Sequence, residues 1–373
     1  MRVLLLGGYG NFGALIAREL ARDVGLELII AGRNAAAAQR LAAELHAAGG
    51  NQIESAVLDV DAPDLAARLG TLAPGLVIHT CGPFQGRDYR VALAALDAGA
   101  HYIDLADARA FVAGIGTLNT RASEANRLVV SGASTVPGLS AAVIDRYRIE
   151  FDALTDIDIG ISPGNRAPRG IATVAAILSY VGRPLHMWTN GQWHNAFGWQ
   201  ALRREHYPDP VGKRWLGDCD VPDLALFPLR YPGLKTLRFG AGLELGFLHL
   251  GLWLLSWPVR WRLLPPLDRW ARGLKRISDW FLAWGSDTGA MHVRLRGTAI
   301  DGKPLTLTWI LIAASGHGPQ VPATAAVVLT RKLARGQLSA RGARPCLDLF
   351  SLDEFLAALQ NHDIRIQVQR ERR

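Results

Sequence analysis

The chain begins with a short apolar run that passes directly into a cluster of glycines. Residues 1–6 read Met-Arg-Val-Leu-Leu-Leu, and Gly8, Gly10 and Gly13 follow in the G-x-G-x-x-G spacing. In such a loop one glycine makes a tight turn, one lets the backbone approach a pyrophosphate, and one allows a helix to pack closely on a strand. Residues 14–22 then have apolar positions at helical spacing, so the N-terminus of this helix would face the phosphates.

A second apolar run over residues 27–31 predicts the strand that completes a βαβ unit. This order of elements predicts that the glycine loop binds a dinucleotide; the alternative is a glycine-rich turn that binds nothing. The loop residues that we assign to the cofactor are Gly8, Tyr9, Gly10, Asn11, Phe12 and Gly13.

The residues after the second strand favour NADP(H) over NAD(H). An NAD site usually places a carboxylate there for the ribose 2′-hydroxyl, whereas an arginine suits a 2′-phosphate. This chain has Arg33 and Asn34 at that point and no carboxylate. The guanidinium of Arg33 would stack on adenine and donate to the phosphate, and Asn34 adds a neutral donor. The alternative is that Arg33 only starts a solvated helix.

A third strand is predicted to end near Asp59. Its carboxylate would meet the adenine amino group, or would cap the next helix together with Asp61. The sequence leaves both alternatives open.

Two further segments resemble a known family. Residues 76–86 form an apolar strand that breaks into a Cys-Gly-Pro-Phe loop, and a helix over 91–99 leads to a strand over 101–107 with an A-G-x-H-Y-x-D pattern. Together with the glycine loop, they resemble the saccharopine dehydrogenase-like NADP-binding family. The resemblance covers about the first 140 residues and returns between residues 316 and 346.

The resemblance implies a fold and a position for the reactive ring. The family's Cys-Gly-Pro loop lies against the nicotinamide ribose, which would place Cys81, Gly82, Pro83 and Phe84 there. The fold class implied is α/β, a Rossmann-type parallel sheet with an inserted α+β substrate domain and a C-terminal return to the first domain. We expect boundaries at 1–135, 136–318 and 319–373, with strand-like alternation at residues 155–161, 291–297 and 305–313 in the inserted domain. The substrate would bind between the domains.

Composition and cysteine spacing narrow the class of protein further. The 373 residues include three scattered cysteines, with neither a disulfide framework nor the C-x-x-C spacing of a metal site, so no metal is predicted. A glycine as early as position 7 interrupts any signal peptide. These features predict a cytoplasmic protein, with membrane association left open.

The first 150 residues hold 13 Lys/Arg and 15 Asp/Glu, so the net charge of +8 comes from the rest of the chain. No nucleic-acid-binding motif accompanies this basic excess.

Tryptophan is concentrated in the second domain. All eleven lie between residues 188 and 309, and six of them between 253 and 284. Leu267, Trp270, Leu274, Ile277, Phe281 and Trp284 keep a three-four spacing, which predicts one amphipathic helix with basic residues on its other faces. The apolar run 243–257 is too short to span a membrane. Residues 243–284 therefore favour either a cover over a hydrophobic substrate or a peripheral membrane contact, and ordinary core packing is the alternative.

The catalytic acid is the hardest residue to place. The candidates are polar groups near the ends of the strands and in the returning Gly-His-Gly loop: His317, Asp107 and Tyr102, with Asp104 and Ser134 behind them. His317 has the most suitable intrinsic pKa, and Asp107 would donate a proton if burial kept it neutral. For each of them a turn, a cap or a core position is the alternative.

The sequence thus predicts an NADP(H)-dependent oxidoreductase that reduces a C=C, C=N or C=O bond of a bulky, partly apolar small-molecule substrate. Whether that substrate is lipid-like is left open. Saccharopine itself, a highly charged amino-acid conjugate, fits the tryptophan-rich domain poorly. The alternative is a non-catalytic NADP(H)-binding sensor that docks to a membrane or a partner. No nucleic acid is expected as a partner, and a homodimer is left open.

Overall fold

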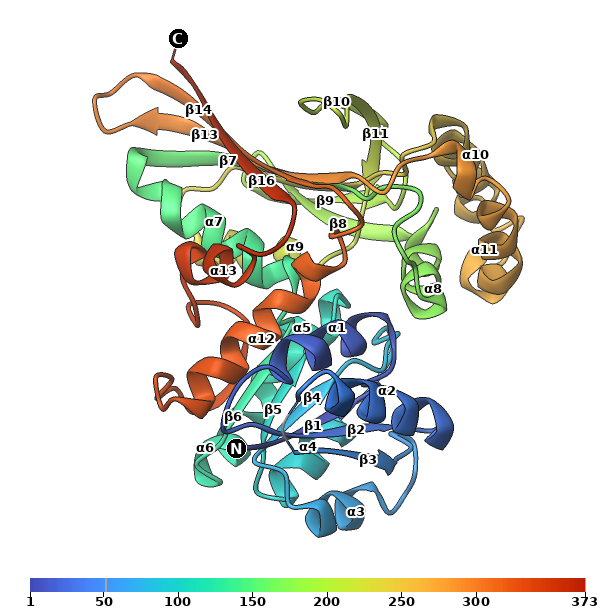
Figure 1. Ribbon diagram of the computed structural model, residues 1–373. Coiled ribbons are helices and arrows are strands. Elements are labelled where there is room, and N and C mark those ends of the chain that lie inside the picture. Colours follow the sequence, from blue (N-terminus) through green and yellow to red (C-terminus); the bar gives the residue numbers. More distant parts are fainter. Residues whose placement is uncertain (51, 373) are drawn as a thin grey trace. The chain divides into compact units, whose positions relative to one another are not determined.

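The computed structural model describes residues 1–50 and 52–372, which divide into two compact units. Unit 1 comprises Met1–Leu139 and Pro319–Ala358, and unit 2 comprises Ser140–Gly318 and the residues from Leu359 onward. Figure 1 traces the elements of both. The predicted boundaries lay at 135/136 and 318/319.

Unit 1 is built on a seven-stranded sheet whose order is β15-β6-β5-β4-β1-β2-β3, with every neighbouring pair parallel. Its strands are β1 (Arg2–Leu6), β2 (Glu27–Gly32), β3 (Ile53–Val57), β4 (Leu76–His79), β5 (His101–Asp104), β6 (Leu128–Ser131) and β15 (Gly342–Pro345). The order of the strands reverses between β1 and β4, where open α/β sheets bind their ligands. The predicted Rossmann-type sheet is confirmed.

The remaining part of unit 1 consists of helices and their connections. The helices are α1 (Asn11–Leu20), α2 (Ala35–Ala47), α3 (Leu65–Leu72), α4 (Arg90–Asp97), α5 (Arg109–Gly114), α6 (Asn119–Glu124), α12 (Gln320–Ala334) and α13 (Leu352–Ala358). In α1 the buried residues Gly13, Ile16, Ala17 and Leu20 recur at helical spacing, as the sequence predicted.

Unit 2 contains a second, mixed sheet of nine strands, with the main order β10-β11-β12-β7-β13-β14-β16. Its strands are β7 (Phe151–Ser162), β8 (Pro184–Thr189), β9 (Gln192–Phe197), β10 (Arg203–His206), β11 (Lys213–Asp218), β12 (Thr236–Ala241), β13 (Gly289–Ala299), β14 (Pro304–Ala313) and β16 (Ile364–Arg372). The three predicted strands correspond to β7, β13 and β14, which pair antiparallel. The parallel pairing of β12 with β7 makes the sheet mixed.

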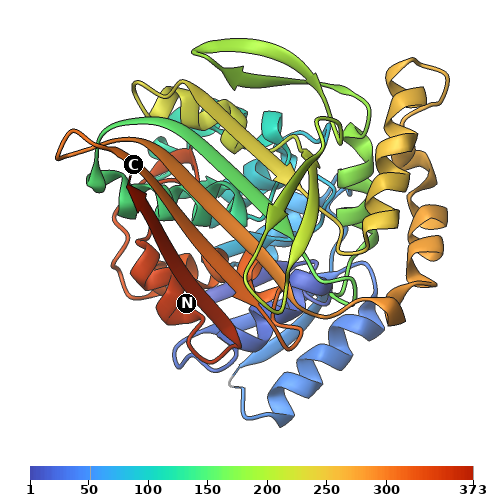
Figure 2. The ribbon, with the colours of Figure 1, turned by 90° about the horizontal axis from the view of Figure 1, so that it is seen from above.

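The helices of unit 2 are α7 (Ser140–Tyr147), α8 (Ile171–Tyr180), α9 (Asp223–Arg230), α10 (Gly246–Arg260) and α11 (Ala271–Asp279). Both ribbon views show α10 and α11 side by side at the edge of this unit (Figures 1 and 2). Within the described residues, none of the helices combines the length and apolar character that crossing a membrane requires.

The single amphipathic helix predicted over residues 267–284 is wrong in two respects. The chain forms 3₁₀ turns over Leu267–Trp270 and Leu282–Trp284, so that only Ala271–Asp279 is α-helical. The apolar stripe is also not buried as a whole: Leu267 is fully buried, whereas Trp284 is 68% exposed. The prediction of one buried stripe is wrong because one end of the segment packs in the core and the other end is exposed.

The end of the chain divides between the two units. We expected residues 319–373 to return together to the first domain, and α12, β15 and α13 do lie in unit 1. The strand β16 instead pairs antiparallel with β14 in unit 2, from Ile364 opposite Ala313 to Arg372 opposite Leu305. The alternation of Ile364, Ile366 and Val368 with polar residues is the sequence signal of this strand.

Candidate cofactor-binding site

The glycine loop between β1 and α1 leaves no room for side chains on its inner side. A Cβ atom at Gly13 would lie 2.2 Å from the carbonyl oxygen of Gly7, so only hydrogen fits there. At Gly10 a Cβ would meet only that same oxygen, at 3.1 Å, which leaves the backbone open for a ligand. Gly10 also precedes α1 without any side-chain cap, so the first N–H groups of the helix are available. This loop fits a pyrophosphate.

Tyr9 ties the glycine loop to the end of β2. Its hydroxyl accepts a hydrogen bond from the backbone N–H of Asn34 at 2.8 Å. Its ring covers Gly32, where a Cβ would lie 2.5 Å from the Tyr9 oxygen. The sequence assigned Tyr9 to the cofactor but gave no sign of this contact, which holds the backbone on both sides of Arg33.

Arg33 is exposed, and none of the described residues forms a hydrogen bond or an ion pair with its side chain. Asn34 serves as the N-cap of α2, since its side-chain oxygen accepts from the N–H of Ala37 at 3.0 Å. The guanidinium of Arg33 is therefore free to meet a phosphate, whereas only the amide nitrogen of Asn34 remains as a donor.

Asp59 lies just beyond β3 and accepts a hydrogen bond from the N–H of Asp61 at 3.1 Å. This contact is a local turn and not the helix cap that the sequence left open as the alternative, because α3 begins at Leu65 with Asp64 at its N-cap. Because the contact uses one carboxylate oxygen, a role at the adenine stays a prediction.

The Cys-Gly-Pro-Phe loop meets the glycine loop between β4 and β1. The hydroxyl of Thr80 lies 2.9 Å from the carbonyl oxygen of Leu6. Gly7 has φ +77°, and a Cβ there would lie 2.7 Å from Thr80 Oγ1 and 2.9 Å from Cys81 Sγ. Gly7 and Thr80 were not among the predicted site residues, because only the parallel pairing of β1 with β4 brings them together.

The loop itself is well packed. The Gly82–Pro83 peptide is cis. The buried ring of Phe84 packs edge-on against His79, with ring centroids 4.9 Å apart. Burial raises the pKa of the Cys81 thiol to about 12, so this side chain is neutral near pH 7.

Tyr102 lies in the core behind this loop. Its side chain is 1% exposed, and its hydroxyl lies 2.9 Å from Nδ1 of His79. Burial lowers the pKa of His79 to about 3, so this imidazole is neutral. The neighbouring Asp104 accepts hydrogen bonds from the N–H groups of Ala106 and Gly132, yet burial raises its pKa to about 6. Tyr102 is therefore part of a buried polar group under the loop.

Asp107 follows β5 and is half-buried. It accepts a hydrogen bond from the side-chain amide of Gln85 at 3.2 Å, and burial raises its pKa above the usual range. Gln85 follows Phe84 directly in the chain, and its own amide oxygen is buried without a partner. A carboxyl group with a raised pKa thus lies next to the Cys-Gly-Pro-Phe loop.

His317 lies in unit 2, in the turn before α12. Its Nδ1 accepts a hydrogen bond from the N–H of Asp363 at 3.0 Å, and its ring packs on His362. The three candidate acids therefore have separate surroundings: Tyr102 in the core of unit 1, Asp107 beside Gln85, and His317 in the other unit.

A cluster of ionisable residues in unit 2, of which His292 is buried and the two carboxylates are half-buried, was not predicted. Asp158, Glu205 and His292 each place one ligand atom within 4.8 Å of the others. The guanidinium of Arg294 lies 3.4 Å from Asp158 Oδ2 and 3.2 Å from Glu205 Oε2. It therefore already neutralises the oxygens that a metal would require, and we assign this cluster to charge pairing.

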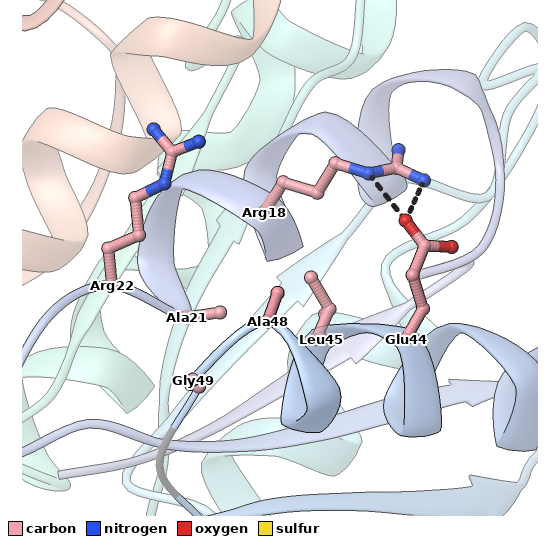
Figure 3. Close-up of a pocket in the computed structure, with 8 residues that line it drawn as sticks. Arg18, Ala21, Arg22, Glu44, Leu45, Ala48 and Gly49 are labelled. Carbon is pink, nitrogen blue, oxygen red and sulfur yellow. Dashed lines mark hydrogen bonds and ion pairs between the residues drawn. The ribbon is translucent and has the colours of Figure 1, made fainter.

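A separate hollow lies at the far ends of α1 and α2 (Figure 3). Arg18 donates to Glu44 at its rim, at 2.9 Å, and the apolar lining includes Ala21, Leu45 and Ala48. These residues lie in the C-terminal halves of the two helices or just beyond their last residues, whereas the glycine loop precedes the N-terminus of α1. The hollow is thus distinct from the cofactor site.

Residues 3–131 match a family model described as the saccharopine dehydrogenase NADP binding domain. This part of the chain is similar to the NADP-binding domain of saccharopine dehydrogenases. Its cofactor is NADP(H), which the open glycine loop and the unpaired Arg33 fit. The match confirms the resemblance to the saccharopine dehydrogenase-like family that the sequence indicated for this domain.

Among solved structures, the fold is similar to an apo saccharopine dehydrogenase (L-Glu forming) from Saccharomyces cerevisiae. That match has a TM-score of 0.68 and 15% identity, and it covers 99% of each chain. An amine dehydrogenase from Mycobacterium smegmatis matches with a TM-score of 0.48 and 12% identity, over 94% of this chain and 95% of that one. The search of curated proteins found no match. The match to the saccharopine dehydrogenase shows that the whole chain shares the fold of that protein.

Proposed function

We propose that this chain is an NADP(H)-dependent oxidoreductase that reduces a C=C, C=N or C=O bond of a bulky, partly apolar substrate. The observation that carries the proposal is the contact between two loops at the switch point of the sheet, where Gly7 lies against Thr80 and Cys81. The first loop suits a pyrophosphate, and by family resemblance the second adjoins the nicotinamide ribose. A chain that holds both parts of the dinucleotide is suited to use its reactive ring.

When bound, NADPH supplies a hydride from its nicotinamide ring. The chain's own part is to bind, to orient and to manage protons. The backbone at Gly10 would approach the pyrophosphate, and Arg33 would select the 2′-phosphate. The neutral thiol of Cys81 adds no charge where the ring would lie, so it would not compete as a nucleophile.

We assign the proton donor to Asp107. Burial raises the pKa of this carboxyl, and a raised pKa makes a carboxyl better suited to donate a proton to the atom that gains negative charge. Gln85 would hold it in place through the bond of 3.2 Å. His317 is the second candidate. Tyr102 is the third, and its burial and its contact with His79 favour a supporting role.

The substrate class rests on unit 2. Its helices α8 and α10 are rich in apolar side chains, several of them only half-buried, such as Val174, Ile177 and Trp253. We also propose that residues 243–284 make a peripheral membrane contact, and the alternative is that they cover an apolar substrate. Either role favours a substrate with a large apolar part.

The test follows NADPH consumption with carbonyl, imine and enoyl acceptors that carry progressively longer apolar chains. We expect turnover that improves with apolar length. Asp107→Asn should bind NADPH normally and lose about 10²- to 10⁴-fold in rate. NADPH binding without consumption in the presence of any acceptor would instead favour the sensor, and unchanged turnover by Asp107→Asn would remove that residue's role.

A further inference from the structure

Helices α10 and α11, with the turns that join and follow them, carry a large exposed apolar surface. We call residues 246–284 the tryptophan surface; Figure 2 shows its two helices side by side. Trp280 is 72% exposed and Trp284 is 68% exposed. The other exposed apolar side chains of the surface are Phe247, Leu254, Trp261, Leu263, Trp270, Ile277 and Leu282. So many exposed large apolar side chains on two neighbouring helices favour an interaction site.

The exposure is a property of well-anchored helices. Val259, Leu267 and Ala271 are buried against Leu178 and Val181, at the end of α8. The segment is thus packed on the end of α8 through these three residues.

The two helices also hold each other in register. Phe247, near the start of α10, packs on Phe281 and Trp284 beyond the end of α11, with ring centroids 5.0 and 5.8 Å apart. Phe281 therefore belongs to the support of the surface. This aromatic contact fixes Trp284 at one end of the tryptophan surface.

Unpaired positive charge accompanies the apolar side chains. Four exposed arginines have side chains that form no hydrogen bond or ion pair with any of the described residues. They are Arg262, Arg269, Arg272 and Arg276. Lys275 differs, because it pairs with Asp279 at 2.7 Å. The only acidic residues in the tryptophan surface are Asp268 and Asp279, so its net charge is clearly positive.

We propose that the tryptophan surface docks onto an anionic lipid bilayer. Indole rings prefer the boundary between apolar chains and polar headgroups, and unpaired guanidinium groups suit the phosphates and carboxylates of anionic lipids. None of the described helices is able to span a bilayer, so the helices would lie in the interface. The inference deepens the proposed function and rests on it in one respect: a substrate with a large apolar part would be taken from the same bilayer.

The experiment is co-sedimentation of the full chain, with saturating NADPH, on two kinds of vesicle: pure phosphatidylcholine, and the same lipid with about one third phosphatidylserine. We expect at least tenfold stronger binding to the anionic vesicles. Raising the salt from about 0.05 to 0.5 M should weaken that binding at least tenfold, because screening shortens the range of the arginine charges. No binding to anionic vesicles at low salt, or equal binding to both vesicles, would overturn the proposal.

Variants separate the two components of binding. Trp280→Ser with Trp284→Ser should weaken binding at least tenfold at both salt concentrations, whereas Arg272→Gln with Arg276→Gln should weaken it chiefly at low salt.

Matched controls change equivalent residues elsewhere and should bind like the wild type. Leu229→Ser removes an apolar side chain that is 84% exposed on α9. Arg40→Gln with Arg335→Gln removes two exposed arginines from unit 1. Equal losses in variants and controls would contradict the proposal. So would a dimer that forms without lipid and is lost in the tryptophan variants, because the occupant would then be a second copy of the chain.

NADPH titration of each variant keeps this test apart from the enzymatic proposal. The cofactor site lies in unit 1, so all variants should bind NADPH as the wild type does. Vesicle binding without turnover of any acceptor would contradict only the oxidoreductase proposal. Turnover without vesicle binding would contradict only the docking proposal.

Discussion

Replacing Gly13 by alanine should damage the fold and the cofactor site together. A Cβ at this position would lie 2.2 Å from the Gly7 oxygen and 2.8 Å from the Cα of Gly8, so the loop or the helix has to move by about 1 Å. Overpacking of this kind costs about 1–3 kcal/mol. Alanine would return up to about 1 kcal/mol in helix propensity, because Gly13 lies within α1. We expect the free energy of unfolding to fall by about 1–2 kcal/mol, and NADPH affinity to fall with it.

Gly70→Ala is the matched control. Gly70 also lies within a helix, α3, but a Cβ there meets no atom within 4 Å. Alanine should therefore raise the stability of unit 1 by up to about 1 kcal/mol and leave NADPH affinity unchanged. Urea denaturation followed by circular dichroism, and calorimetric titration with NADPH, measure both quantities. If Gly13→Ala is as stable as the wild type and binds NADPH equally well, the tight contact of the loop with the helix is not what shapes the site.

Three further predictions concern single side chains. Tyr9→Phe removes the acceptor for the Asn34 N–H and should lower the free energy of unfolding by about 1 kcal/mol. It should also weaken the binding of NADPH more than that of NADH, which calorimetry measures. Equal weakening of both would argue against a role of Tyr9 in supporting the 2′-phosphate site. Burial would raise the pKa of Asp158, but His292 and the Arg203 guanidinium outweigh it and lower the pKa to about 2. Asp158→Asn should thus lose about 2 kcal/mol at pH 7, a difference that shrinks as the pH falls from about 4 toward 2; a gap that is constant with pH would refute the pairing. The thiol of Cys81, with a pKa near 12, should react with iodoacetamide at pH 8 at least tenfold more slowly than free cysteine does, and mass spectrometry would detect fast labelling if it occurs.

Local signals were enough to predict the core of the cofactor site. The strand, the glycine spacing and the helix that follows lie in one continuous segment from Arg2 to Leu20, and each part has its own chemistry. The position of Arg33 follows in the same way from the end of the second strand. The contact of Gly7 with Thr80 did not follow, because those residues are more than 70 positions apart and meet only after β1 and β4 pair.

Other features depend on packing that a pattern of apolar residues does not encode. The spacing from Leu267 to Trp284 predicted one buried stripe, but the same spacing serves a buried face at one end and an exposed face at the other. Tyr102 follows the sequence pattern of a residue near the end of a strand, yet its contact with His79 makes it a core residue. The assignment of β16 to the second sheet required a partner strand, β14, that the alternation of residues 364–368 alone does not identify.

The most direct test of the cofactor assignment is the affinity of the wild-type chain for NADPH and for NADH, measured by calorimetry beside Arg33→Ala. Arg33 has no protein partner among the described residues and is exposed, so its contact with a 2′-phosphate is charge-assisted but screened by water. We predict that NADPH binds more tightly than NADH by about 1.5 kcal/mol, which is about tenfold, and that Arg33→Ala removes most of this preference without weakening NADH. Equal affinity of the wild type for both cofactors, or an unchanged preference in Arg33→Ala, would contradict the account.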